Sequence, residues 1–306
     1  MNFKTPNGVL SRAGQWFMNQ PYLLLSLTSL FWGANVVIGR YAAGHVPPIM
    51  HAYIRWVGAF FIVLPFVWPQ LKRDWPLIRE NLPQMLMLSF TGISCYNSMA
   101  YYGLQYTEAL NGLLMQSSIP LFVAMWALVL YRIRLTFVQF AGIVISLLGV
   151  VAIIIRGDID LLRRITFNPG DLWILGALGV FSFYTAAAMK RPTMAPISFL
   201  TFTMGAGGFM LTPFALWEIS TGFVVSFDFK TLLILAYTVT TPSILGYLFF
   251  NRGVELIGAN RAAPFTHLMP VFGSVLAIGF LGEQFRLYHA IGYTLVIFGI
   301  FIAARK

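Results

Sequence analysis

The sequence repeats itself at a distance of 150 residues, and this repeat constrains the fold more than any other feature. When the chain is aligned with itself at that distance without gaps, identical glycine, alanine, proline and phenylalanine residues coincide. The pairs are Gly103 with Gly253, Ala109 with Ala259, Pro120 with Pro270, Phe122 with Phe272, Ala127 with Ala277, Gly142 with Gly292, and Gly149 with Gly299. Glycine, alanine and proline fix helix bends and close helix contacts. We therefore infer two copies of one structural unit.

The composition indicates the class of protein. Hydrophobic residues make up 58% of the 306 residues and charged residues only 10%, whereas soluble domains average about 25% charged residues. A soluble domain this apolar could not cover its surface, so we expect a polytopic membrane protein. The net charge of +10 is expected from basic cytoplasmic loops and does not call for a nucleic-acid partner. Cys95 is the single cysteine; we interpret it as a packing residue.

Ten apolar segments have the length of a membrane-spanning helix. They are residues 21–43, 48–68, 82–103, 109–130, 136–155, 170–189, 196–217, 231–251, 258–280 and 287–304. Each approaches the roughly 20 residues that cross a hydrocarbon core of about 30 Å. The runs are continuous and lack the alternation of a membrane β-barrel. The sequence therefore predicts an all-α polytopic membrane protein with ten transmembrane helices.

The repeat divides these helices into two groups of five. We expect an N-terminal cytoplasmic stub at 1–20, a first five-helix repeat at 21–156, a linker at 157–169 and a second five-helix repeat at 170–304. Because five is odd, the second repeat must cross the membrane in the opposite direction to the first. Inverted repeats are typical of secondary transporters, which bind substrate at the repeat interface and work by alternating access. Channels and structural proteins also contain them, so a non-transporting receptor or scaffold is an alternative.

The basic residues of the loops predict the orientation. One side carries twelve: Lys4, Arg12, Lys72, Arg73, Arg79, Arg132, Arg134, Lys190, Arg191, Arg252, Arg305 and Lys306. The other side carries six: Arg40, Arg156, Arg163, Arg164, Lys230 and Arg286. The positive-inside rule then places both termini in the cytoplasm. The pair Arg163 and Arg164 runs against this bias, although Asp158 and Asp160 lie beside it.

Residues 101–149 and 251–299 resemble the two EamA domains of the drug/metabolite transporter superfamily. The shared pattern is an aromatic-rich helix end, an alanine-rich turn, a proline near the middle of the next span, Leu-Gly-Glu, and a helix with two glycines seven residues apart. The second copy shows it nearly complete, as Ala259, Pro270, Leu281-Gly282-Glu283, Gly292 and Gly299. The first copy departs from Leu-Gly-Glu at Leu130-Tyr131-Arg132. Trp32-Gly33-Ala34-Asn35 also resembles the first-helix signature of these proteins.

Within the superfamily, the chain most resembles the YddG-type exporters of aromatic and other neutral amino acids. This resemblance implies a multi-pass carrier of the bacterial inner membrane, whose partners are the lipid bilayer and a small-molecule substrate. An exporter of hydrophobic or quaternary-ammonium compounds is the alternative with the same fold. No catalytic motif, phosphate-binding loop or metal-ligand cluster is present in the sequence. We therefore expect no enzyme activity, no metal and no cofactor.

Charged side chains are rare inside the expected spans. The ten acidic residues are Asp74, Glu80, Glu108, Asp158, Asp160, Asp171, Glu218, Asp228, Glu255 and Glu283, and all fall in loops or near span ends. Because proton-coupled carriers commonly place a carboxylate deep in the membrane, we expect transport without proton coupling. Arg55 and His267 are the ionisable residues well inside spans. Arg55 is a functional candidate; the alternatives are that it pairs with a backbone carbonyl or reaches towards one membrane interface past Trp56.

Aromatic and neutral polar residues coincide in the inner parts of several spans. Polar groups that face lipid without a partner are costly, so these should face inward. Rings beside neutral donors suit a small zwitterion or an organic cation, whereas helix-to-helix hydrogen bonding would explain any single member. The predicted cavity residues are Trp32, Asn35, Tyr96, Asn97, Tyr102, Gln116, Phe183, Tyr184, Tyr247, Asn251 and His267. Pro120 and Pro270 are predicted to be hinges, with a static kink as the alternative.

Overall fold

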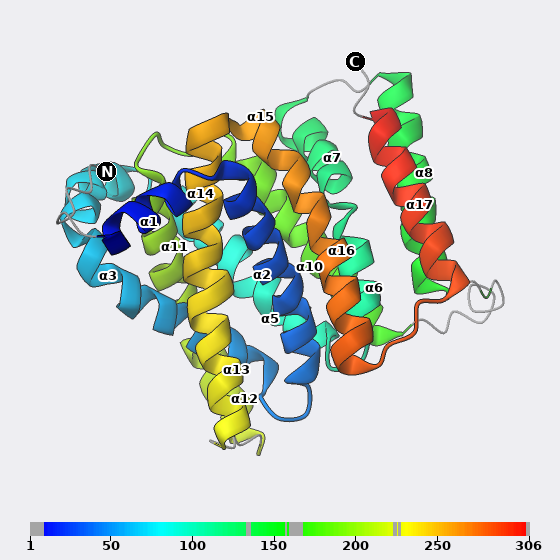
Figure 1. Ribbon diagram of the computed structural model, residues 1–306, viewed down its shortest axis with the longest axis horizontal. Coiled ribbons are helices and arrows are strands. Elements are labelled where there is room, and N and C mark those ends of the chain that lie inside the picture. The colour runs from blue at the N-terminus through cyan, green and yellow to red at the C-terminus, as the bar shows by residue number, and fades with distance from the viewer. Residues whose placement is uncertain are drawn as a thin grey trace.

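The computed structural model describes residues 9–132, 136–156, 158, 168–222, 225 and 228–303, and this part of the chain is helical without β-strands (Figure 1). Most of the linker at 157–169 lies outside the described residues. The same holds for seven basic or acidic residues used to predict orientation: Lys4, Arg134, Asp160, Arg163, Arg164, Arg305 and Lys306.

The first half of the chain forms α-helices interrupted once by a π-helical segment. The elements are α1 (Val9–Met18), α2 (Pro21–Tyr41), α3 (Pro48–Glu80), α4 (Leu82–Ser89), the π-helix η1 (Phe90–Cys95), α5 (Tyr96–Gly103), α6 (Ala109–Gln116), α7 (Ile119–Tyr131) and α8 (Phe137–Ile154). Helix α1 occupies part of the expected stub, and Arg252 holds the turn after it by donating to the carbonyl of Met18.

The second half contains α10 (Pro169–Ala188), α11 (Pro196–Met210), α12 (Thr212–Ser220), α13 (Phe229–Thr240), the π-helix η2 (Thr241–Leu245) and α14 (Gly246–Ile257). It continues with α15 (Ala259–Ala262), the 3-10 helix η3 (Ala263–His267), α16 (Leu268–Leu276), the π-helix η4 (Ala277–Leu281) and α17 (Leu287–Ala303). The π-helices η1 and η2 occupy equivalent places in the two repeats, at offsets of 150–151 residues.

Six described helices are long and apolar enough to cross a membrane, or seven if α6 and α7, which are bent by 48° relative to each other, form one span. Two shorter apolar helices cover 265–281 and 287–302. Helix α3 contains the second expected span, 48–68, and continues to Glu80 through Pro69 and Pro76. At about 1.5 Å per residue its 33 residues exceed a core of about 30 Å. The continuation after Trp68 packs against the rest of the protein, since Leu71 and Ile78 are buried in a hydrophobic cluster.

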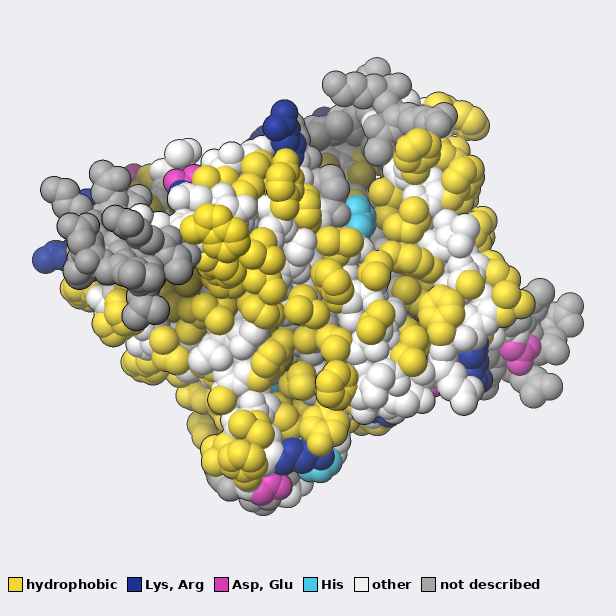
Figure 2. Space-filling view, viewed as in Figure 1, with side chains coloured by type: hydrophobic (Ala, Val, Ile, Leu, Met, Phe, Trp, Pro, Cys, Tyr) yellow, Lys and Arg dark blue, Asp and Glu magenta, His cyan; other side chains and the backbone are white. Residues whose placement is uncertain are grey.

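The surface supports the membrane assignment. Figure 2 shows apolar side chains spread across the middle of one face, with lysine and arginine side chains gathered toward its edges. Exposed apolar residues include Phe66, Val129, Phe137 and Phe280, each more than 65% exposed. Such side chains face hydrocarbon favourably, and the basic residues reach the headgroup region.

The two repeats contact each other along many helix pairs, and two of these contacts bear on the site. Helices α8 and α17 lie side by side at one edge (Figure 1). There the backbones touch at Gly149 with Gly292 and at Gly142 with Gly299, which confirms the expected packing role of these glycines. In the interior, α6 packs against α2, α10 and α16, and every residue from Ala109 to Ser118 is buried. The apolar core around α6 therefore joins both halves of the chain.

Candidate functional site

A cavity of about 220 Å³ lies where residues of the two repeats come together. Seven of the eleven residues predicted from the sequence line it: Trp32, Asn35, Tyr96, Asn97, Gln116, Tyr247 and His267. Both predicted hinge residues, Pro120 and Pro270, line it as well. The lining contains repeat-related residues, because Tyr96 and Tyr247 are 151 positions apart and both contribute.

Four predicted residues do not line this cavity. Tyr102 packs against Trp173, with ring centroids 5.0 Å apart, and Phe183 packs against Trp126 at 5.2 Å. Tyr184 contacts Phe181 at 5.6 Å. Asn251 lies further along α14, outside the lining.

For Tyr102 and Phe183 the cause is helix periodicity, since successive side chains on a helix point about 100° apart. On α5 the neighbour Tyr101 lines the cavity instead of Tyr102, and on α10 Phe181 lines it instead of Phe183. Tyr184 and Asn251 lie about one helical turn beyond Phe181 and Tyr247, the last lining residues of α10 and α14. The sequence showed the right helices but gave too weak a periodic signal on them to fix which face turns inward.

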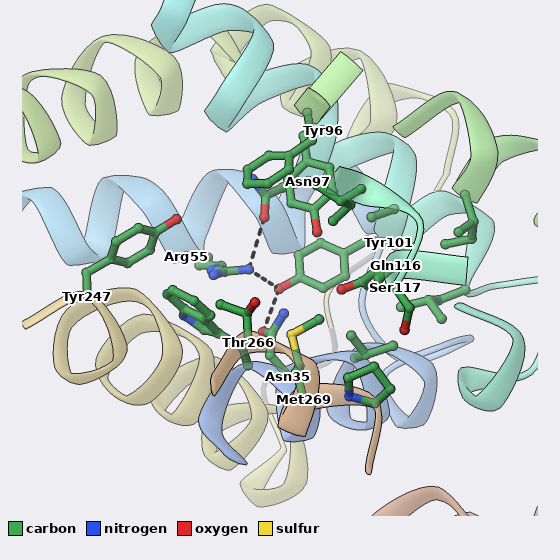
Figure 3. Close-up of a pocket in the computed structure, with 18 of the residues that line it drawn as sticks. Asn35, Arg55, Tyr96, Asn97, Tyr101, Gln116, Ser117, Tyr247, Thr266 and Met269 are labelled. Atoms are coloured by element: carbon green, nitrogen blue, oxygen red, sulfur yellow. Dashed lines mark hydrogen bonds between the residues drawn. The ribbon is translucent and has the colours of Figure 1, made fainter. Parts of the chain in front are cut away.

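Arg55 of α3 lies at the centre of the polar part of the cavity (Figure 3). Its Nε donates to Ser243 Oγ at 2.6 Å, and its Nη1 donates to Asn97 Oδ1 at 3.0 Å and to the Tyr101 hydroxyl at 2.8 Å. The guanidinium also lies 4.5 Å from the Trp56 ring centroid. The sequence shows that Arg55 is a charged residue inside a span. It does not show which groups Arg55 contacts, so its place in the cavity was not predicted.

The π-helices orient two of the groups that receive these hydrogen bonds. A π-turn releases carbonyls from the regular helix pattern and is frequent at functional sites. Asn97 Nδ2 donates to the carbonyl of Ile93 in η1 at 2.9 Å, so its Oδ1 is the atom turned toward Arg55. Ser243 lies in η2 and donates its hydroxyl hydrogen to the Thr238 carbonyl at 2.7 Å, which leaves its oxygen to accept from Arg55.

Tyr101 extends this network to α2. Its hydroxyl accepts from Arg55 and donates to Asn35 Oδ1 at 3.0 Å. Its ring stacks on His51, with centroids 4.1 Å apart and planes within 6°. The Tyr101 hydroxyl thus acts both as acceptor and as donor, and it links Arg55 to α2 through a chain of hydrogen bonds.

Aromatic rings form another part of the wall. Trp32 contacts Tyr247 edge to face at 5.3 Å, and its indole nitrogen donates to the Pro242 carbonyl in η2 at 3.1 Å. Tyr96 packs against Phe181 at 4.5 Å. The cavity therefore presents flat apolar faces beside a fixed positive charge.

A set of polar contacts lies beside the cavity, on the side predicted to face the periplasm. They hold the segment Leu104–Asn111, which runs from the end of α5 into the first turn of α6 and whose Leu104 lines the cavity. Arg40 donates to the carbonyls of Leu104 and Gln105 at 2.9 and 3.0 Å. The Asp171 carboxylate accepts hydrogen bonds from the Thr107 hydroxyl and from the Asn111 side-chain amide. The Oδ1 atom of Asn111 also lies within hydrogen-bond distance of His289 Nε2, at 2.9 Å.

Glu283, the last residue of the Leu-Gly-Glu motif, also holds this segment. Its two carboxylate oxygens accept the backbone N–H groups of Ala109 and Leu110 at 2.8 Å each, at the N-terminus of α6. Burial raises the pKa of the Glu283 carboxyl, while these two hydrogen bonds act in the opposite direction. A carboxylate at this place satisfies amides that have no partner within the helix. The motif therefore ties the second repeat to the first.

No group of three His, Cys, Asp or Glu side chains within the described ranges lies close enough together to hold a metal ion.

Known proteins match the chain over nearly its whole length. The chain is 26% identical to the uncharacterized transporter YyaM of Bacillus subtilis over 92% of this chain and 93% of that protein. It is 24% identical to a protein of Salmonella typhimurium named "Probable amino-acid metabolite efflux pump", over 91% and 93%. A solved crystal structure shares the fold with a TM-score of 0.59 at 17% identity, over 92% of this chain and 95% of that one.

The EamA-like transporter family matches residues 19–155 and 168–305, once in each half of the chain. Together these two matches cover most of the 306 residues. This multi-pass membrane protein belongs to the EamA-like transporter family.

Proposed function

We propose that this transporter exports neutral and aromatic amino acids from the bacterial cytoplasm by alternating access. The observation that carries the proposal is the small cavity between the repeats, where aromatic faces lie beside neutral polar groups and a single fixed charge. The proposal includes ten crossings of the inner membrane in two inverted five-helix repeats, with both termini in the cytoplasm.

The size of the cavity favours a small solute. Sites for drug-sized ligands occupy about 300–1,000 Å³, whereas this cavity occupies about 220 Å³. Trp32, Tyr96 and Tyr247 supply rings that can stack on an apolar side chain. The name of the Salmonella relative, an amino-acid metabolite efflux pump, supports the same class of cargo.

The contacts between the repeats support alternating access. The segment Leu104–Asn111 is held by side chains from α2, α10 and the 283–289 region. Release of these contacts would open the cavity on the side predicted to be periplasmic. Inverted repeats can exchange such roles, so that a closed end on one side corresponds to an open end on the other.

Flux measurements in proteoliposomes test this function. We expect saturable uptake of labelled tryptophan and leucine, with unlabelled amino acids competing. Trp32→Ala removes one ring contact, worth about 0.5–1.5 kcal/mol, and should raise the apparent KM for tryptophan about two- to tenfold. Trp217→Ala is the matched control, because Trp217 is 60% exposed and lies outside the cavity.

Two outcomes would contradict the proposal in different ways. Saturable movement of a quaternary-ammonium dye without competition by amino acids would favour the drug exporter. Absence of flux for a broad solute panel, together with a stable protein partner, would favour a receptor or scaffold.

A further inference from the structure

We propose that Arg55 binds the carboxylate of the transported solute, and that the solute's ammonium group contributes little to recognition. The transporter would then select aromatic carboxylates as a class, including those that lack an amino group. This inference rests on the proposed transport function and narrows its substrate class.

The first argument is the number of hydrogen-bond donors on Arg55. A guanidinium carries five N–H groups, one on Nε and two on each Nη. The single N–H of Nε is used by Ser243, and the two N–H groups of Nη1 are used by Asn97 and Tyr101. Within the described part of the chain, Nη2 has no hydrogen-bond partner, so two donors remain for a solute. Figure 3 shows the guanidinium among the polar residues of the cavity wall.

The second argument is charge. Arg55 is only 4% exposed, and its three hydrogen-bond acceptors are all neutral. None of the described residues lining the cavity is an aspartate or a glutamate. A buried charge is costly unless a counter-charge accompanies it, and a solute carboxylate supplies that counter-charge. Arginine suits this role because its planar donor set matches a carboxylate.

The third argument concerns the ammonium group of an amino acid. With no carboxylate in the wall, this group meets only hydroxyls, amides and rings, such as those of Gln116, Thr266 and Tyr96. Its loss should therefore weaken binding little. An amine without a carboxylate should bind poorly, because it would bring a second positive charge beside Arg55 and no negative charge would balance the two.

The aromatic part of the wall indicates what kind of side chain the solute carries. Trp32 and Tyr247 lie edge to face at 5.3 Å, and Trp32 is fixed by its bond to the Pro242 carbonyl. A planar ring extending from a carboxylate held at Arg55 would meet these faces. The structure thus favours an aromatic ring joined to a carboxylate by a short chain.

Three indole compounds that differ in one group each separate these contributions. Tryptophan carries both charged groups, indole-3-propionate lacks the ammonium, and tryptamine lacks the carboxylate. Each competes against labelled tryptophan in proteoliposomes, and each is tested for thermal stabilisation of the purified protein in detergent. For the wild type we expect tryptophan and indole-3-propionate to act at concentrations within about tenfold of each other, and tryptamine to have no effect at 100-fold excess.

Substitutions at Arg55 test the residue itself. Arg55→Gln should weaken binding of both acids about 10- to 100-fold, as expected for loss of a charge-assisted hydrogen bond. Arg55→Lys keeps the charge without the planar donor set and should recover part of the affinity. Arg79→Gln is the matched control, because Arg79 is an exposed arginine of the same helix outside the cavity.

The outcomes distinguish this inference from the transport function. Competition by tryptamine equal to that of tryptophan, inactivity of indole-3-propionate, or unchanged acid binding by folded Arg55→Gln would each overturn the inference while leaving transport in place. Stabilisation by the two acids without any flux would overturn the transport function, and with it the role of Arg55 in transport. If Arg55→Gln fails to fold, the three compounds on the wild type decide the question.

Discussion

Replacement of Gly149 by alanine should separate helices α8 and α17. A Cβ atom at position 149 would lie 2.5 Å from the carbonyl oxygen of Gly292 and 2.8 Å from the backbone nitrogen of Val296. Both neighbours are backbone atoms, which cannot rotate away as a side chain can. Ordinary contact begins near 3.5 Å, so α17 must move by roughly 1 Å at this crossing.

Two opposing free-energy contributions set the size of the change in stability caused by Gly149→Ala. Overpacking of this kind costs about 1–3 kcal/mol, and alanine in place of glycine within a helix contributes about 1 kcal/mol in the stabilising direction. Gly179→Ala isolates the second term, because no heavy atom lies within 4 Å of the Cβ position at Gly179 in α10. Gly149→Ala should therefore be less stable than Gly179→Ala by about 1–3 kcal/mol.

Thermal unfolding in detergent, followed by the fraction that remains monodisperse, measures this difference. Because no residue of α8 or α17 lines the cavity, stabilisation by a bound amino acid should persist in Gly149→Ala. Equal stability of the two variants would refute the close α8–α17 contact. If Gly149→Ala lost solute binding while Gly179→Ala kept it, the claim that the α8–α17 contact does not affect the cavity would be refuted.

Three further predictions concern topology, coupling and motion. In a chain whose native cysteine has been replaced, a single cysteine at Trp75 should be protected from a membrane-impermeant reagent in whole cells, whereas one at Thr221 should be labelled; the reverse would overturn the orientation. Since no described lining residue is a carboxylate, collapse of the pH gradient should leave counterflow unchanged, and its abolition would make His267 the first suspect. Pro120→Ala and Pro270→Ala should slow transport and shift the accessibility of cavity cysteines in opposite directions. Equal shifts, or none in well-expressed variants, would indicate static kinks.

Much of the architecture could be predicted from the sequence because glycine and proline occur where helices touch or bend. Gly149 and Gly292 stand in the repeat, and in the structure they are the points where α8 and α17 touch. Membrane-spanning segments are also long and apolar, so their existence is easy to recognise. The end of α3 was harder, because a polar run after Trp68 marks the edge of the apolar region and says nothing of where helical hydrogen bonding stops.

The irregular turns could not be predicted. Nothing in the sequence of 90–95 or 241–245 shows that these residues adopt π-helical turns, yet these turns orient Asn97 and Ser243 toward Arg55. Residue type indicates which side chains are costly in lipid. It does not tell which of two adjacent aromatic residues on one helix faces inward, and this choice decides between Tyr101 and Tyr102.

The breaks before the two prolines also became visible only in three dimensions. Helix α6 ends at Gln116, two turn residues follow, and Pro120 then stands in the first turn of α7, where proline is tolerated. In the second repeat the equivalent residues before Pro270 form the 3-10 helix η3. The bend of 48° between α6 and α7 therefore lies just ahead of Pro120, at the wall of the cavity, and a short 3-10 helix takes the equivalent place before Pro270. A hinge at either place would change access to the cavity.

Exchange across the vesicle membrane tests whether one cavity serves both sides in turn. Proteoliposomes are prepared either empty or loaded with unlabelled tryptophan, without any ion gradient, and the initial uptake of labelled tryptophan is compared. A carrier whose loaded form reorients faster than its empty form should show several-fold faster uptake into the loaded vesicles. Equal saturable uptake into empty and loaded vesicles would count against faster reorientation of the loaded carrier. Non-saturable uptake that does not depend on the internal tryptophan would contradict alternating access.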